Sequence, residues 1–137
     1  MPLLTITNRD LLASKIVEPA WYVVKVEDVE EKTSKAGTSQ NFFIIGTIEK
    51  NADNGSTEFA GVPTPPRGWV FNEQYPGNAI GFINSLRPDN PITGEERVEL
   101  ADAKGSRLEV FIGNGTFDGK TVNTIIHQYR PLSEQNR

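Results

Sequence analysis

Short segments rich in β-branched and aromatic residues recur along this chain and are separated by turn-forming Gly, Asn and Pro. Apolar and polar side chains alternate over residues 21–29, which predicts a half-buried strand. Residues 40–49 are apolar on both sides and predict a more buried strand, with a bulge or sharp bend at Gly46. Residues 59–72 predict an irregular third strand with a Pro-rich excursion, because Pro cannot donate to a central ladder.

Two more strands are expected towards the end of the chain, at residues 106–112 and 121–129. The dipeptides Asn114-Gly115 and Asp118-Gly119 lie between them and are typical of hairpin turns. The preceding connection is polar, contains Pro and Gly, and includes a candidate short strand at residues 97–100. We therefore expect the last two strands to form a hairpin.

Helical spacing of apolar residues occurs twice. Residues 8–17, with Thr7 or Asn8 as candidate caps, predict one short helix that ends before Pro19. Residues 78–86 carry an apolar stripe at positions i, i+3, i+4 and i+7 behind Asn78 as the cap, and they predict an amphipathic helix. This second helix lies between the third and fourth strands.

The resulting order of elements is typical of an OB-fold, a five-stranded barrel that binds oligonucleotides across strands 2 and 3. We therefore expect a mainly β fold: a five-stranded OB-fold barrel with a helix between strands 3 and 4 and a short N-terminal helix. Other small α+β domains share this order. The length of 137 residues favours one domain, assigned to residues 1–130, followed by a flexible C-terminal tail at residues 131–137.

The composition argues against most enzymes. Cysteine is absent and His127 is the only histidine, so thiolate and multi-histidine metal sites lack ligands. No phosphate-binding glycine loop followed by lysine and a helix is present. The acidic residues within positions 27–31 follow one another along a strand, so their side chains alternate between faces instead of converging on one ion. We expect no enzymatic activity, no metal and no cofactor.

Charge and hydropathy bear on the partners. The net charge is −4, whereas nucleic-acid-binding domains are often basic, although Lys104, Arg107, Lys120 and Arg130 give one stretch a local basic excess. The longest apolar stretch, residues 42–45, is far shorter than a membrane span, and the N-terminus does not resemble a signal peptide. We expect a soluble protein without a membrane partner.

Several motifs resemble those of phage-encoded OB-fold single-stranded DNA-binding proteins. The similarity extends from about Leu11 to Arg130. It rests on residues 17–26 entering the first strand, the Lys-Ala-Gly loop before the second strand, residues 51–55 leading to residues 59–62, residues 68–72, and residues 110–120. Ala20 stands where many of these proteins have Gly, and the acidic tail of bacterial single-strand binders is missing.

The resemblance implies a non-catalytic protein that binds single-stranded DNA with little sequence preference. It implies action in phage DNA replication or recombination, in the cytoplasm of an infected bacterial host, with phage replication or recombination proteins as further partners. A homodimer would gain avidity for the strand. The alternative is an OB-fold protein-interaction or structural module of a phage that binds no nucleic acid.

Single-strand binding requires aromatic faces for the bases and cations for the phosphates. Trp69, between Gly68 and polar neighbours, is the leading candidate for an exposed stacking platform, although each aromatic could equally belong to the core. Phe43 would join the outer surface if Phe42 and Ile44 point inwards. The candidate nucleic-acid-binding residues are Lys25, Lys32, Lys35, Phe43, Arg67, Trp69, Phe71, Arg107, Lys120, Tyr129 and Arg130.

Overall fold

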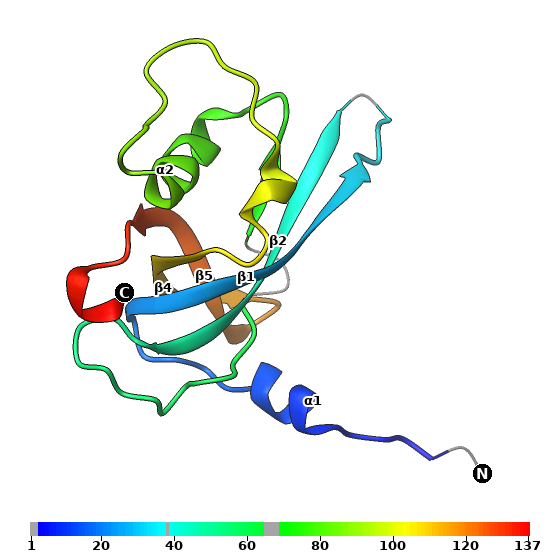
Figure 1. Cartoon of the computed structure of the whole chain (residues 1–137). Coiled ribbons are helices and arrows are strands. Elements are labelled where there is room, and N and C mark those ends of the chain that lie inside the picture. Colours follow the sequence, from blue (N-terminus) through cyan, green and yellow to red (C-terminus); the bar gives the residue numbers. More distant parts are fainter. Residues whose placement is uncertain (1–2, 38, 65–68) are drawn as a thin grey trace.

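The computed structural model describes residues 3–37, 39–64 and 69–137 and contains one open, five-stranded antiparallel sheet with two short α-helices (Figure 1). The expected mainly β class is confirmed, but the sheet does not close into a barrel. In chain order the elements are α1 (Asn8–Ala13), β1 (Ala20–Thr33), β2 (Gln40–Asn51), β3 (Val70–Asn72), α2 (Gly77–Leu86), the 3-10 helix η1 (Leu100–Ala103), β4 (Arg107–Phe117), β5 (Lys120–Arg130) and the 3-10 helix η2 (Glu134–Asn136).

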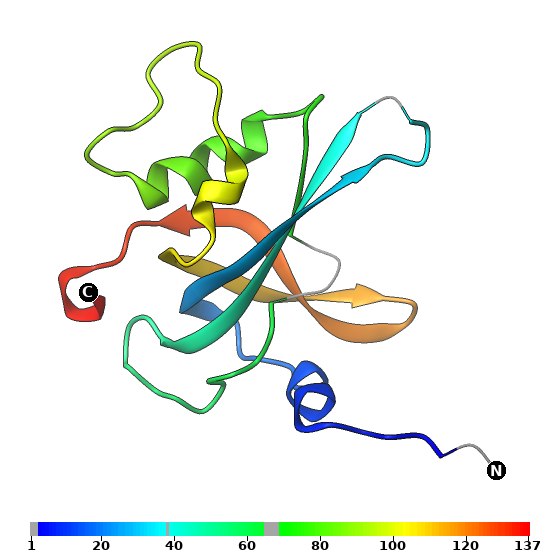
Figure 2. The same cartoon turned by 45° about the vertical axis from the view of Figure 1, so that its right-hand side comes forward.

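β1 is the central strand of the sheet, whose order is β3-β2-β1-β4-β5. Its first half pairs with both β2 and β4, whereas residues after Lys25 pair only with β2. The hairpins β1–β2 and β4–β5 project from the body on the same side of the molecule (Figure 2). The two end strands approach each other through side chains, because the rings of Phe71 on β3 and His127 on β5 lie 5.6 Å apart.

The alternation in the sequence correctly predicts which side of β1 and β4 faces the core. Tyr22, Val24 and Val26 on β1 are buried, as are Leu108, Val110 and Ile112 on β4. α2 packs Ala79, Phe82 and Ile83 against this core, while Val17 is buried on the approach to β1. We call the opposite side of the sheet the outer face.

Gly46 marks an irregularity in the sheet, as its sequence context predicts. Val26 pairs with Gly46 and Asp28 with Ile45, so β1 has one extra residue at this point. A Cβ atom on Gly46 would lie 2.8 Å from Val24 Cγ1 and 3.1 Å from the carbonyl oxygen of Lys25. Glycine is required here because the neighbouring strand comes too close for any side chain.

Local details differ from the sequence-based expectations at both helices and at the last hairpin. Thr7, one of the two predicted candidates, is the cap of α1, and Asp10 completes a capping box, but the helix ends at Ala13 and not at residue 17. At α2, Pro76 and not Asn78 is the cap. The hairpin turn is formed by Asp118 and Gly119, whose φ values are 53° and 75°. Asn114-Gly115 instead lies within β4, because the strand pairing between β4 and β5 continues past it to Phe117.

The connections around β3 and before β4 contain less strand than expected. Residues 59–61 form a turn, and in the described part of the chain between β2 and the three-residue β3 the only strand pairing is an isolated bridge between Thr47 and Pro63. Residues 97–99 form no strand, and the helix η1 follows at Leu100. Within the described ranges, no helix is long and apolar enough to cross a membrane.

Candidate nucleic-acid interface

The outer face of β1, β2 and β4 brings together four of the predicted site residues, which are Lys25, Lys32, Phe43 and Arg107. Lys25 pairs with Thr47 on one side and with Arg107 on the other. Further along the same hairpin, Glu30 pairs with Phe43. Paired residues of neighbouring strands share a face, and Phe42 and Ile44 contribute to the core, so Phe43 points outwards as expected.

Phe43 carries a cation above its ring. The Nζ atom of Lys32 lies 5.2 Å from the ring centroid of Phe43, within the range of a cation–π contact. The same Nζ atom lies 3.5 Å from a carboxylate oxygen of Glu30, and both side chains are well exposed. Phe43 is half-buried, so part of its ring surface is open to a ligand.

A groove of about 520 Å³ lies beside Phe43, and we call it the outer groove. β2 contributes Phe43 and Ile45, the segment before β3 contributes Pro63, and the β4–β5 hairpin contributes Val122 and Asn123. Glu30 and Lys32 also line it. The outer groove lies between β2 and the last hairpin, in the region where the sequence predicted that single-stranded DNA binds.

Trp69 is not the exposed platform that we expected. Only 2% of its surface and 2% of that of Phe71 are accessible. The indole stacks on Tyr129 with 6.1 Å between ring centroids, and its edge meets Phe82 at 5.6 Å. A nucleobase therefore has no free indole face on which to stack, even though Trp69 touches the outer groove.

Tyr129 also belongs to this aromatic cluster, which agrees with the alternative that it is a ring of the core. Its hydroxyl forms a hydrogen bond of 2.9 Å with Nδ1 of His127, and burial raises the pKa of Tyr129 well above its ordinary value. Burial also lowers the pKa of His127, which favours the neutral imidazole. The cluster of Trp69, Phe71, Phe82, His127 and Tyr129 fills the space between β3 and β5.

The two predicted arginines on β4 and β5 are held by carboxylates. Arg107 Nε lies 2.5 Å from Glu49 Oε1. Arg130 Nε lies 2.5 Å from Glu109 Oε1, and its Nη2 lies 2.8 Å from Asp53 Oδ1. The Arg130 guanidinium also sits 4.3 Å above the ring of Trp21. These contacts neutralise two of the seven cations that the sequence assigned to phosphate binding.

Residues 131–137, which we call the C-terminal strap, were expected to be flexible but are held against the sheet. Asn136 is buried and donates to the carbonyl oxygen of Ala52 and to Glu109 Oε2. The amide of Ser133 donates to the same Glu109 oxygen at 2.7 Å. The strap and Arg130 thereby enclose the Glu109 side chain, which has no accessible surface.

The Glu109 carboxylate was missed by the sequence analysis because strand alternation assigns it to the outer face. Burial by itself would raise the pKa of Glu109, but hydrogen bonds from Asn136, Ser133 and Arg130 outweigh burial and lower it. The only signal in the sequence is the opposite charge of Glu109 and Arg130 on neighbouring strands. The polar composition of the strap gives no sign that it docks.

Three of the remaining predicted cations are exposed lysines. Lys35, in the turn after β1, and Lys120, at the start of β5, are exposed, as is Lys25. None of these three lysines forms an ion pair with another residue of the described ranges. Arg67 lies outside the described residues.

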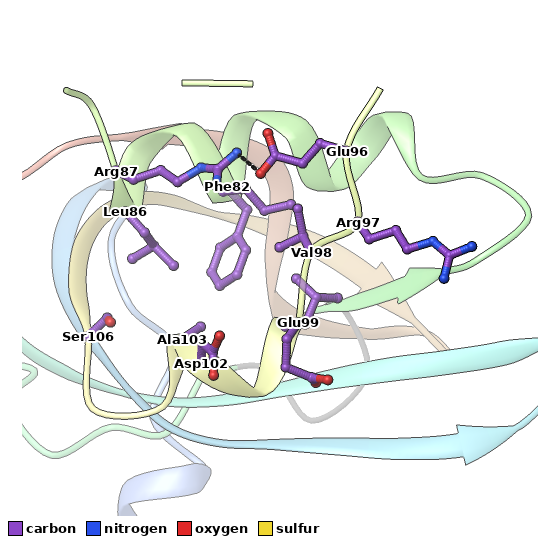
Figure 3. A pocket seen from close by; sticks show the side chains of 12 residues that line it. Phe82, Leu86, Arg87, Glu96, Arg97, Val98, Glu99, Asp102, Ala103 and Ser106 are labelled. Carbon is purple, nitrogen blue, oxygen red and sulfur yellow. Dashed lines mark ion pairs between the residues drawn. The ribbon is translucent and has the colours of Figure 1, made fainter. Parts of the chain in front are cut away.

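A separate cavity of about 310 Å³ lies between α2 and residues 96–106 and contains no predicted site residue (Figure 3). Arg87, just after α2, pairs with Glu96 at 2.5 Å across its upper side. Phe82, Leu86 and Val98 supply apolar surface, and Glu99 and Asp102 supply carboxylates. The Arg87–Glu96 pair ties the loop before η1 to the end of α2.

The chain matches no family model and no curated protein.

Proposed function

We propose that this chain is a non-catalytic OB-fold protein that binds single-stranded DNA with little sequence preference. Its strand order supports the OB-fold assignment, since β1, β2 and β3 follow one another while β4 and β5 extend from the other side of β1. OB barrels are often partly open, which agrees with an aromatic contact instead of backbone pairing between β3 and β5. Phage DNA replication or recombination in an infected bacterial cell is the proposed setting.

The observation that carries the proposal is Phe43 on the outer face, with Lys32 above its ring and the outer groove beside it. A half-exposed aromatic offers a face to any base, and stacking contributes about 1–3 kcal/mol per base. The neighbouring ammonium of Lys32 would pair with a phosphate of the same nucleotide. Phe43 therefore replaces Trp69 as the stacking residue.

The strand would run across the outer groove between the two projecting hairpins. Lys25 and Lys32 on β1, Lys35 in the following turn, and Lys120 at the tip of the last hairpin would follow its phosphates. Apolar contacts from Ile45 and Val122 in the groove carry no hydrogen-bond pattern for particular bases. Binding of this kind protects the strand and removes its hairpins without sequence preference.

The charge distribution favours a second candidate, a phage protein-interaction or structural module on the same scaffold. Arg107 and Arg130 are engaged by carboxylates, Glu30 lies beside Lys32, and the net charge is −4. A surface of this kind attracts phosphates weakly. Direct binding measurements separate the two candidates.

The test replaces Phe43 by Ala and measures affinity for fluorescent oligo-dT by anisotropy. We expect binding at least tenfold weaker, because loss of one stacked base costs roughly 1–3 kcal/mol. Tyr75→Ala is the matched control, since Tyr75 is an aromatic residue 71% exposed outside the outer groove. Urea unfolding of both variants checks that the folded state persists.

A second variant keeps the test decisive if Phe43→Ala is unstable. Phe43→Trp retains the ring and should bind oligo-dT with a decrease in fluorescence beyond that of the unchanged protein. Unchanged affinity in Phe43→Ala, with no additional quenching in Phe43→Trp, would exclude Phe43 as the platform. If the unchanged protein fails to bind oligo-dT at all, the interaction module becomes the better candidate.

A further inference from the structure

The outer groove has aliphatic side chains on the side next to the ring of Phe43. Ile45 lies two residues further along β2, so its side chain points to the same face as the ring of Phe43. Pro63, in the segment before β3, and Val122, on β5, are half-buried and line the groove as well. Ile16, from the chain after α1, is 43% exposed and also lines it. A base stacked on Phe43 would therefore direct one edge towards aliphatic carbon atoms.

The uncharged polar side chains that line the outer groove are engaged within the protein. The Thr64 hydroxyl accepts a hydrogen bond from the amide of Gly46 at 3.0 Å and donates one to its carbonyl oxygen at 3.3 Å. The Asn123 amide forms two hydrogen bonds of 2.9 Å with the backbone of the segment between α1 and β1. Nε1 of Trp69 is buried. None of these groups is open to the hydrogen-bonding edge of a base.

The charged side chains of the outer groove pair with each other. Glu30 and Lys32 are the charged residues among the described residues that line it. Their carboxylate and ammonium groups lie 3.5 Å apart, and both side chains are well exposed. The recognition that remains available beside Phe43 is apolar contact.

Apolar contact distinguishes bases that carry an aliphatic group on their edge. Thymine carries one, the 5-methyl group, and side chains recognise this group by apolar contact. Burial of one such carbon strengthens binding about fourfold. Uracil has the same hydrogen-bonding groups as thymine but lacks the methyl group, so the groove should bind it less tightly.

We propose that the outer groove binds the 5-methyl group of a pyrimidine that stacks on Phe43, with Ile45 and Val122 as the contact residues. This inference rests on the proposed binding of single-stranded DNA, and it defines which strands the groove favours. One methyl contact biases the composition of the bound strand and reads no order of bases, which agrees with little sequence preference. Because RNA contains uracil in place of thymine, the contact also favours DNA over RNA.

The experiment compares oligonucleotides that differ only in the methyl group. The first pair is oligo-dT and oligo-dU, and the second is an oligonucleotide of 5-methyl-dC and oligo-dC. Each competes with fluorescent oligo-dT for the full chain in anisotropy titrations. We expect the methylated member of each pair to bind about fourfold more tightly. The two pairs differ in their hydrogen-bonding edges, so an equal factor in both assigns the preference to the methyl group.

Ile45→Thr with Val122→Thr in one chain assigns the preference to the groove. Thr keeps the β-branched shape and the strand propensity but places a hydroxyl group beside the methyl group. We expect the affinity ratio to fall close to one in both pairs. Val98→Thr is the matched control, since Val98 is 37% exposed and lies outside the outer groove, and it should keep the fourfold ratio.

Urea unfolding checks that both variants are folded. If the double variant does not fold, Val122→Thr alone should lower the ratio to about twofold, because one of the two contact residues remains. An unchanged ratio in that single variant would contradict the role of Val122.

The outcomes separate this inference from the proposed function. Equal affinity within each pair, while Phe43→Ala still weakens binding, would overturn methyl recognition and leave single-strand binding in place. A fourfold preference that persists in the folded double variant would also overturn it, because the methyl group would then act outside the contacts with Ile45 and Val122. Failure of the unchanged protein to bind any of the four oligonucleotides would overturn both proposals.

Discussion

Trp69 is the largest of the fully buried side chains, and its role is to hold the aromatic cluster between β3 and β5 together. We predict that Trp69→Ala lowers the free energy of unfolding by about 3–5 kcal/mol, because a large ring leaves a cavity that the core cannot refill. Urea denaturation measures the change. Tyr75→Ala, at an exposed position, should remain within about 0.5 kcal/mol of the unchanged protein, and an equally small effect at Trp69 would contradict its placement.

Glu109 makes the stability of the protein depend on pH. Because the hydrogen bonds around this carboxylate lower its pKa in the folded state, its stabilising contribution is complete above the ordinary pKa of a glutamate. The contribution is lost as the pH falls through the lowered folded-state pKa. We predict that the free energy of unfolding declines from about pH 5 downwards and that Glu109→Gln is less stable at pH 7 and declines less. Urea midpoints measured across this range test the prediction, which fails if the two proteins show parallel curves.

Individual side chains show what alternation in a sequence can and cannot reveal. It correctly placed Val24 and Val26 inside and Lys25 outside because these three successive residues of β1 alternate between the two faces of the sheet. It could not place Trp69 and Phe71, since β3 has only three residues and its inward side depends on β2. It left the side of Phe43 open, because β2 is apolar on both sides, and the pairing of Phe43 with Glu30 places its ring on the outer face.

At the level of strands, the close approach at Gly46 joins β1, β2 and the segment before β3. The amide of Gly46 donates a hydrogen bond to the Thr64 hydroxyl oxygen at 3.0 Å. We predict that Gly46→Ala destabilises the protein by about 1–3 kcal/mol through overpacking against Val24 and Trp69. Gly94→Ala is the control because a Cβ there would meet no atom within 4 Å. Thermal or urea unfolding that ranks the two variants equally would contradict the close approach.

The strands were more predictable than the connections between them. Hydrophobic patterning located β1, β2, β4 and β5, and the apolar stripe located α2. The patterning did not predict the extension of β4 to Phe117, because residues 113–116 contain no apolar side chain. The docking of the C-terminal strap was equally hidden, since it depends on hydrogen bonds from Ser133 and Asn136 to a distant glutamate.

Considered as a whole, the molecule offers four lysines around the outer groove as phosphate contacts, and this sets the expected strength and salt dependence of DNA binding. Each phosphate neutralised on a single strand contributes a slope of about −0.7 to the logarithm of affinity against that of salt concentration. With Lys25, Lys32, Lys35 and Lys120 as contacts, four times 0.7 gives a slope no steeper than about −3. Single strands should bind better than duplex, because stacking on Phe43 requires unpaired bases.

Anisotropy titrations at several salt concentrations test this expectation. Lys32→Gln with Lys35→Gln should make the slope shallower, whereas Lys104→Gln, an exposed lysine after η1, should leave it unchanged. Equal affinity for duplex and single strands, or a slope unaffected by the double substitution, would place the binding surface elsewhere.

The central position of β1 also determines when this protein can fold during synthesis. β1 can pair with β2 soon after both leave the ribosome, but its other edge stays unpaired until β4 is made. The hydrogen bond from Asn136 to the carbonyl oxygen of Ala52 joins residues 84 positions apart in the sequence. Folding with so many distant pairings is expected to be slow. Until β4 arrives, the β1–β2 hairpin presents an open edge to other nascent chains. Glu27, Glu30 and Glu31 lie on the part of β1 that β4 never covers, and their like charges disfavour pairing of this permanently open edge with a second copy.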